Sequence, residues 1–109
     1  MNQPLQDFRK ELEAMQRDLL RVMDGYAQKF DIKRDDLWLT AKLSEELGEV
    51  MQAYLRVVGR ARSEQPKELL KEKLEDEVAD LFGMLLIFAD KMEVDLPTAL
   101  QRKWLKHLP

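Results

Sequence analysis

The feature that most constrains this chain is an apolar stripe near its start, in which spacings of three and four residues alternate. Its members are Leu5, Phe8, Leu12, Met15, Leu19, Val22 and Tyr26. This heptad spacing is typical of a helix that packs lengthwise against other helices. Because no segment alternates between apolar and polar residues as a half-buried strand does, the sequence predicts an all-α chain.

The few glycines and prolines divide the chain into four expected helices. Gly25 and Gly59 suit helix ends, whereas Asp35, Pro66 and Asp95 suit helix starts. The expected helices cover about 4–25, 36–58, 66–92 and 95–107. We therefore expect a single domain over residues 1–109 with a four-helix-bundle-like fold of three long helices and a short C-terminal one. The apolar stripe and an apolar third helix leave surface for a partner, so we expect oligomerisation to complete the bundle.

Composition restricts the chemistry open to these 109 residues. Cysteine is absent and the one histidine is His107, which excludes a disulfide framework and a cysteine-based zinc site. A metal site would therefore use mostly carboxylates, which suit hard cations such as Mg²⁺ or Mn²⁺. With 21 acidic and 18 basic residues, the net charge of -3 argues against a duplex nucleic-acid binder.

Hydropathy gives no reason to expect a membrane partner. The first residues lack the apolar stretch of a signal peptide, and the uncharged run at 81–89 is far too short to cross a bilayer. On these grounds we expect a cytoplasmic protein.

Two acidic groups stand apart from the ordinary charged helix surface. Glu45, Glu46 and Glu49 form an E-E-x-x-E pattern, and they share one helix face although like charges at this spacing repel each other. Glu77 and Asp80 form an E-x-x-D pattern just before the uncharged run, where a carboxylate would be partly desolvated. Two antiparallel helices would present these five carboxylates to each other and bind one or more divalent cations.

Glycines lie inside both acidic helices. Gly48 and Gly83 each cost about 1 kcal/mol relative to alanine in a helix interior. Their benefit would be room, either for close approach of the two helices or for a ligand against the backbone.

The joint pattern resembles the signature of the MazG-like all-α nucleoside triphosphate pyrophosphohydrolases, which are related to the dimeric dUTPases. In that signature E-E-x-x-E is followed, after a spacer, by E-x-x-D. Here the spacer between Glu49 and Glu77 has 27 residues, and the resemblance extends from about Trp38 to the C-terminus. It implies hydrolysis of a nucleoside triphosphate to the monophosphate and pyrophosphate, with Mg²⁺ as cofactor and a homodimer or a dimer of dimers as assembly. The nucleotide that is preferred stays open.

The resemblance also implies roles for individual residues. The family's metal-binding and catalytic positions correspond to Glu45, Glu46, Glu49, Glu77 and Asp80, one of which would act on the attacking water. A C-terminal substrate-binding element of the family corresponds to the stretch with Lys103 and Lys106. In this chain His107 stands where the family usually has asparagine.

Helical spacing adds two candidate substrate contacts near the stripe of Glu45. Trp38 would stack on a base, or else it packs in the core or at a dimer interface. Arg56 would form a basic rim with Arg60 and Arg62 that attracts triphosphate, or else these residues are solvated.

Two other functions compete with the enzyme. A non-enzymatic helical dimerisation or interaction module would explain the apolar stripe and the charged surface, but not the opposed acidic groups. A di-iron carboxylate bundle ranks last, because such sites normally use Glu-x-x-His and this chain has no histidine near its carboxylates.

Overall fold

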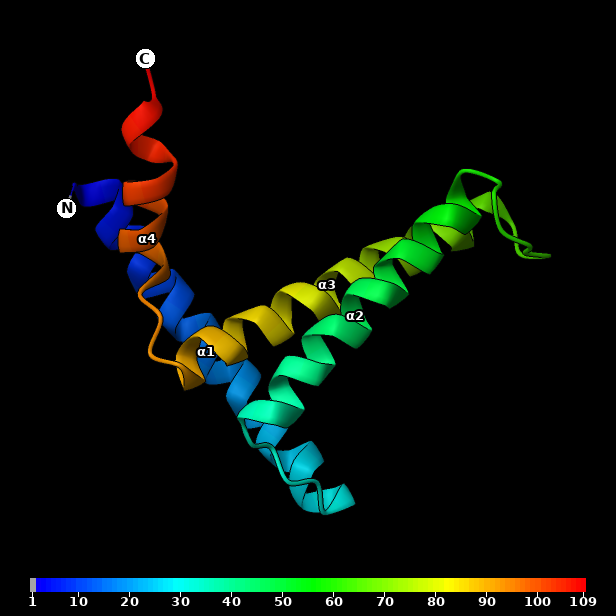
Figure 1. Cartoon of the computed structure of the whole chain (residues 1–109), viewed down its shortest axis with the longest axis horizontal. Coiled ribbons are helices and arrows are strands. Elements are labelled where there is room, and N and C mark those ends of the chain that lie inside the picture. The colour runs from blue at the N-terminus through cyan, green and yellow to red at the C-terminus, as the bar shows by residue number, and fades with distance from the viewer. Residues whose placement is uncertain (1) are drawn as a thin grey trace. The chain divides into compact units, whose positions relative to one another are not determined.

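The computed structural model describes residues 2–109, and its helices run in the order that the sequence predicts (Figure 1). They are α1 (Gln3–Phe30), α2 (Asp36–Val57), α3 (Lys67–Lys91) and α4 (Leu96–Lys103), followed by a short 3-10 turn, η1 (Leu105–His107). No strand occurs in residues 2–109. The prediction of an all-α chain with three long helices and a short C-terminal one is therefore confirmed. No helix within this range is both long and apolar enough to span a membrane.

Side-chain caps start three of the helices. Asn2 accepts a hydrogen bond from the backbone N–H of Leu5 at α1, and Asp35 accepts one from Trp38 at α2. At α4, Asp95 accepts one from the N–H of Thr98 at 3.1 Å. Each cap satisfies a backbone donor that the helix cannot pair itself. The predicted starts at Asp35 and Asp95 are thus confirmed.

The expected end of the first helix at Gly25 is wrong, whereas the expected end of the second at Gly59 is confirmed. α1 continues through Gly25 to Phe30, and Asp31 then takes a left-handed conformation with φ of 52°. The N–H of Ile32 closes this end on the carbonyl of Ala27 at 3.0 Å. A glycine inside a helix costs only about 1 kcal/mol, so it does not stop a helix that gains packing beyond it.

The chain forms two compact units. One combines Met1–Ile32 with Leu86–Pro109, and the other consists of Lys33–Leu85. We call them the terminal unit and the central unit. α3 contributes its first part to the central unit and its last residues to the terminal unit. That the two units make a single domain stays a prediction.

The core of the terminal unit uses part of the apolar stripe on α1. Leu5 and Leu12 are buried, as are Leu86 and Ile87 at the end of α3. Among them the buried side chain of Gln16 donates a hydrogen bond from Nε2 to the carbonyl oxygen of Leu86 at 3.0 Å. Leu19 is half-buried, and the other four members of the stripe are exposed: Phe8, Met15, Val22 and Tyr26.

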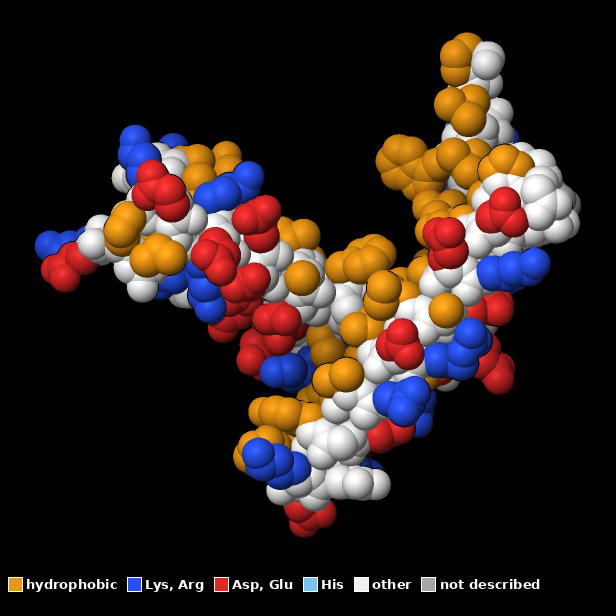
Figure 2. All heavy atoms as spheres, turned by 180° about the vertical axis from the view of Figure 1, so that it is seen from behind, with side chains coloured by type: hydrophobic (Ala, Val, Ile, Leu, Met, Phe, Trp, Pro, Cys, Tyr) orange, Lys and Arg blue, Asp and Glu red, His pale blue; other side chains and the backbone are white. Residues whose placement is uncertain are grey.

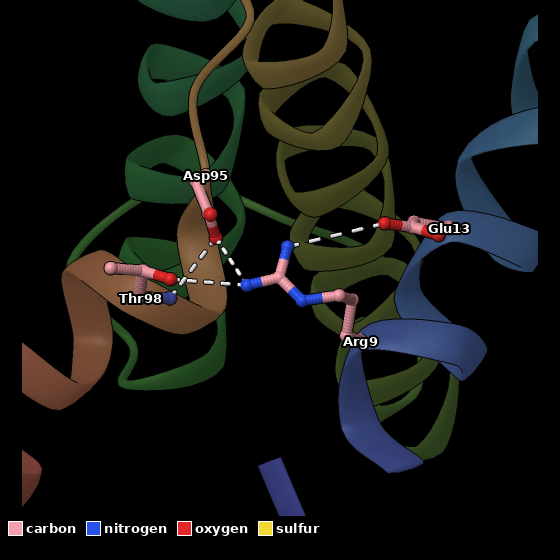
Figure 3. Close-up of polar contacts among 4 residues, drawn as sticks. All are labelled: Arg9, Glu13, Asp95 and Thr98. Atoms are coloured by element: carbon pink, nitrogen blue, oxygen red, sulfur yellow. Dashed lines mark hydrogen bonds and ion pairs between the residues drawn. The ribbon is translucent and has the colours of Figure 1, made fainter. Parts of the chain in front are cut away.

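A polar group joins α1 to the start of α4 in this unit (Figure 3). Arg9 donates from one guanidinium nitrogen to Asp95 Oδ1 at 2.8 Å and to Thr98 Oγ1 at 3.0 Å, and its other terminal nitrogen lies 4.0 Å from Glu13. We call these four residues the Arg9 cluster. The hydrogen bond from Arg9, assisted by the N–H of Thr98, lowers the pKa of Asp95 below its usual value.

The central unit is a helical hairpin of α2 and the first part of α3, which run side by side in opposite directions (Figure 1). Leu39 and Ala53 of α2 and Met84 of α3 are buried in it. The turn between the two helices begins at Gly59, whose φ of 77° is a left-handed conformation that glycine adopts without strain. The hairpin therefore brings the two acidic segments of the sequence to facing helices.

Candidate metal centre

Three of the five predicted carboxylates meet between the helices of the hairpin. Glu46 comes from α2, and Glu77 and Asp80 come from successive turns of α3. One carboxylate oxygen from each residue lies within 4.8 Å of the other two. We call these three residues the carboxylate trio. Figure 2, which shows one face of the molecule, has Asp and Glu side chains gathered along the hairpin.

Burial within the trio is graded from the inside outwards. Glu77 is 6 % exposed and the side chain of Glu46 is 13 % exposed, whereas Asp80 is exposed to solvent. Two carboxylates are thus largely removed from water, and the third opens the group to solvent. Charges in such a place need compensation, because desolvation of an unpaired carboxylate costs several kcal/mol.

Two lysines provide part of that compensation. Lys73 Nζ lies 2.7 Å from Glu77 Oε1, and Lys42 Nζ lies 3.8 Å from Glu46 Oε1. The hydrogen bond with Glu77 is the main reason why the pKa of Lys73 is raised. The pair therefore favours the charged form of Lys73. The involvement of Lys73 was not predicted, although its position four residues before Glu77 on a helix is a signal for an ion pair.

The lysines do not fully compensate the trio. Burial raises the pKa of Glu46 above its usual value, the negative charge of Asp80 raises it further, and Lys42 opposes both effects. The carboxyl group of Glu46 therefore loses its proton less readily than a free glutamate does. A divalent cation between these oxygens would reverse the effect, since it favours the ionised form of every ligand.

The donor set fits a hard divalent cation. Mg²⁺ binds oxygen ligands at about 2.1 Å in octahedral geometry, so opposite ligands are about 4.2 Å apart. The 4.8 Å limit within the trio exceeds this only slightly, and small side-chain rotations would close the difference. The exposure of Asp80 leaves positions open for water and for a ligand. All donors are carboxylate oxygens, which favours Mg²⁺ or Mn²⁺ over softer metals.

Glu45 and Glu49 lie beside the trio and are not part of it. Glu45 is 58 % exposed and pairs with Lys42 at 3.2 Å. Glu49 is exposed, and it is near enough to Lys73 for its negative charge to contribute to the raised pKa of that lysine. That these two residues bind metal or act in catalysis stays a prediction.

The glycine of the acidic segment on α2 does not serve the packing of the chain itself. A Cβ atom added at Gly48 would meet nothing within 4 Å. Close approach of the helices therefore does not explain this glycine, and the open space beside it remains for a ligand.

Trp38 precedes the acidic segment along α2, and Arg56 follows it. The ring of Trp38 is half-buried, and Lys42 Nζ lies 5.9 Å from its centroid. Arg56 is in the last turn of α2, ten residues after Glu46 and thus about 15 Å further along the helix axis. Contact of either residue with a substrate stays a prediction.

The remaining predicted substrate contacts belong to the terminal unit. Lys103 is the last residue of α4, and Lys106 and His107 lie in η1. All three side chains are exposed. The cations at the end of α4 also interact favourably with its dipole, so their presence there has a structural reason as well. Their predicted role in binding phosphate or base stays a prediction.

Comparison with known proteins adds no further assignment. No family model matches the chain, and neither a curated protein nor a solved structure matches it. The resemblance to the MazG-like pyrophosphohydrolases therefore rests on the spacing of the five carboxylates.

Proposed function

We propose that this protein is a Mg²⁺-dependent nucleoside triphosphate pyrophosphohydrolase that acts in cytoplasmic housekeeping of the nucleotide pool. The observation that carries the proposal is the carboxylate trio, in which two largely buried acids and one exposed acid share a space of metal-site size. Burial of like charges is unfavourable for folding alone, and a metal site gives it a reason. The E-E-x-x-E and E-x-x-D spacing supports the choice of reaction.

The side chains of the trio would hold the cation, and Lys73 forms an ion pair with Glu77 beside it. When bound, Mg²⁺ neutralises phosphate charge and makes water a better nucleophile. Water attacks the α-phosphorus, the bond from that phosphorus to the bridging oxygen breaks, and pyrophosphate leaves with the bonding electrons.

Glu49 is our candidate for the group that accepts the proton of the attacking water. Of the two carboxylates beside the trio, Glu45 is held by Lys42. The side chain of Glu49 has no ion pair or hydrogen bond with another described residue. A carboxylate that forms no ion pair and lies next to the proposed metal ligands is suited to general-base catalysis.

The proposal is tested by pyrophosphate release from a panel of canonical, deoxy and modified nucleoside triphosphates, with Mg²⁺, with Mn²⁺ and with EDTA. We expect metal-dependent release of pyrophosphate and monophosphate in equal amounts, followed by ³¹P NMR. Glu49→Gln should reduce turnover and leave Mn²⁺ affinity intact, whereas Asp80→Asn should reduce both. Glu75→Gln is the control, because Glu75 is an exposed acid on the same helix as Asp80. Full turnover of Glu49→Gln at saturating Mg²⁺ contradicts the assigned role.

Exposed apolar residues support a homo-oligomer of at least two chains. On α1 they are Phe8, Met15, Val22, Tyr26 and Phe30. A single face with this many large apolar side chains is typical of an interface. Light scattering at micromolar concentration should give at least the mass of a dimer, and Met15→Lys with Val22→Lys should lower it. A monomeric mass for the unchanged protein contradicts the proposal.

The same face favours one alternative function, a non-enzymatic helical interaction module. That function predicts the oligomer without pyrophosphate release. The nucleotide panel therefore distinguishes the two functions in one measurement.

A further inference from the structure

A second charged site lies at the end of the hairpin, where α2 turns towards α3. A shallow hollow of about 550 Å³, wide open to solvent, lies there. It is lined by Arg56, Gly59, Arg60, Arg62, Ser63 and Leu70, among others. We call it the arginine pocket. Three arginines line it, and no acidic residue is among its lining residues.

The backbone at the end of α2 places these arginines around one space. Gly59 donates to the carbonyl of Arg56 at 3.2 Å, and the N–H of Arg60 donates to the carbonyl of Leu55 at 2.8 Å. This pair of hydrogen bonds is a Schellman motif, which reverses the chain across the end of a helix. The residues that follow Gly59 are thereby brought back beside Arg56.

The charge of the pocket is not neutralised by the protein. The three arginines have no ion pair or hydrogen bond from their side chains to any other described residue. Three cations around one concave space repel each other unless an anion lies between them. Guanidinium groups bind phosphate oxygens through two parallel hydrogen bonds, so phosphate is the anion that they suit best.

The pocket is separate from the carboxylate trio along the hairpin. Arg56 follows Glu46 by ten residues on α2, about 15 Å along the axis, and Leu70 precedes Glu77 by seven residues on α3, about 10 Å. A diphosphate group held by the arginines would therefore not be the same group that the trio contacts through a cation. The inference does not depend on the proposed catalytic function.

We propose that the arginine pocket binds the diphosphate or triphosphate group of an anionic ligand. Three guanidinium groups match the charge of such a group better than that of a single phosphate. The ligand is either free pyrophosphate or the phosphate tail of a nucleotide, because both present the same chemistry to the arginines.

Calorimetric titration of the whole chain with pyrophosphate, in EDTA and about 0.15 M salt, tests the proposal without the metal centre. We expect pyrophosphate to bind more tightly than orthophosphate and sulfate. A nucleoside triphosphate that binds no more tightly than pyrophosphate identifies the phosphates as the whole ligand. Tighter binding of the triphosphate, with no binding of the monophosphate, identifies a nucleotide tail. Failure of both to bind, or equal binding of orthophosphate, overturns the proposal.

The variant Arg60→Gln with Arg62→Gln should weaken pyrophosphate binding about tenfold or more, because it removes two charge-assisted contacts. Arg17→Gln with Arg21→Gln is the matched control, since it removes the same charge from exposed positions on α1. Equal weakening in both variants overturns the proposal. Mn²⁺ binding to the carboxylates should be unchanged in both, so a failure of the pocket and a failure of the metal centre give different results.

Discussion

The Arg9 cluster and the carboxylate trio are two polar groups of the same chain with opposite electrostatics. In the Arg9 cluster a guanidinium lies between two carboxylates, and the pKa of Asp95 is lowered. In the trio three carboxylates gather with compensation from the flanks, and the pKa of Glu46 is raised. The first arrangement favours the charged form of its acid and the second disfavours it.

The Arg9 cluster stabilises the fold, whereas the gathered charges of the carboxylate trio destabilise it. Asp95 caps α4 and connects it to α1 through Arg9, so its interactions contribute to folding. Glu46 is held near Asp80 and Glu77 with little access to water, so its charged form opposes folding. Residues that oppose folding in this way are found where function requires them.

The largest expected effect tests the functional side of this comparison. Glu46→Gln should reduce kcat/KM at saturating Mg²⁺ about 100-fold or more, the size of effect seen when a charge-stabilising group is lost. The same variant should raise the melting temperature of the metal-free protein, because it removes a desolvated like charge. Glu75→Gln should change neither quantity. Unchanged kcat/KM in Glu46→Gln would contradict a functional role for the trio.

A buried polar residue of the terminal unit gives the next effect. Gln16→Ala should lower the free energy of unfolding by about 1–3 kcal/mol, because the buried carbonyl of Leu86 loses its side-chain donor. Urea denaturation measures this change. Gln28→Ala, at an exposed position on the same helix, should have little effect. Equal stability of the two variants would show that the hydrogen bond is not needed.

Two glycines of the central unit should respond to alanine with opposite signs. Gly48→Ala should raise the free energy of unfolding by up to about 1 kcal/mol, because Gly48 lies inside a helix with open space around it. Gly59→Ala should lower it by about 1 kcal/mol, because φ is 77° there. Lower activity of Gly48→Ala, despite its higher stability, would indicate a ligand beside α2. Stabilisation by both substitutions would contradict the assigned conformation of Gly59.

The smallest effect concerns pH and the Arg9 cluster. A folded-state pKa below the unfolded value of about 3.9 means that Asp95 contributes stability above that pH, and that the contribution is lost as the pH falls through the folded pKa. Asp95→Asn retains an oxygen that can cap α4 but removes the charge. Thermal unfolding between pH 7 and pH 2 should therefore depend less on pH in this variant. An unchanged pH dependence would contradict the role of the ion pair.

Much of the helix order follows from local chemistry, which explains why it was predicted. Asp35 and Asp95 cap helices through contacts within three residues, and Gly59 supplies a conformation that few residues adopt easily. Gly25 misled the prediction because the end of α1 depends on Asp31, which takes the left-handed conformation without being a glycine. Spacing alone cannot distinguish a permissive glycine from a terminating one.

The acidic segments were predicted from local spacing as well. Which of their five carboxylates meet in the trio was not predicted. The one-turn spacing of Glu77 and Asp80 places both on one helix face, so their meeting is local. That Glu46 joins them, while Glu45 turns to Lys42, depends on where the facing helix lies. The cavity at Arg56, Arg60 and Arg62 likewise depends on a chain reversal, and the sequence indicated only a basic rim.

The discontinuous terminal unit has a consequence for synthesis on the ribosome. Lys33–Leu85 is contiguous, so every residue of the central unit is present once Leu85 has emerged. Met1–Ile32 is made before the hairpin but packs with Leu86–Pro109, which is made after it. The apolar stripe of α1 therefore stays exposed to solvent until Leu86–Pro109 has been synthesised. During that interval the core of the terminal unit is not yet formed. The charged side chains of α1 then have to keep the nascent chain from aggregating.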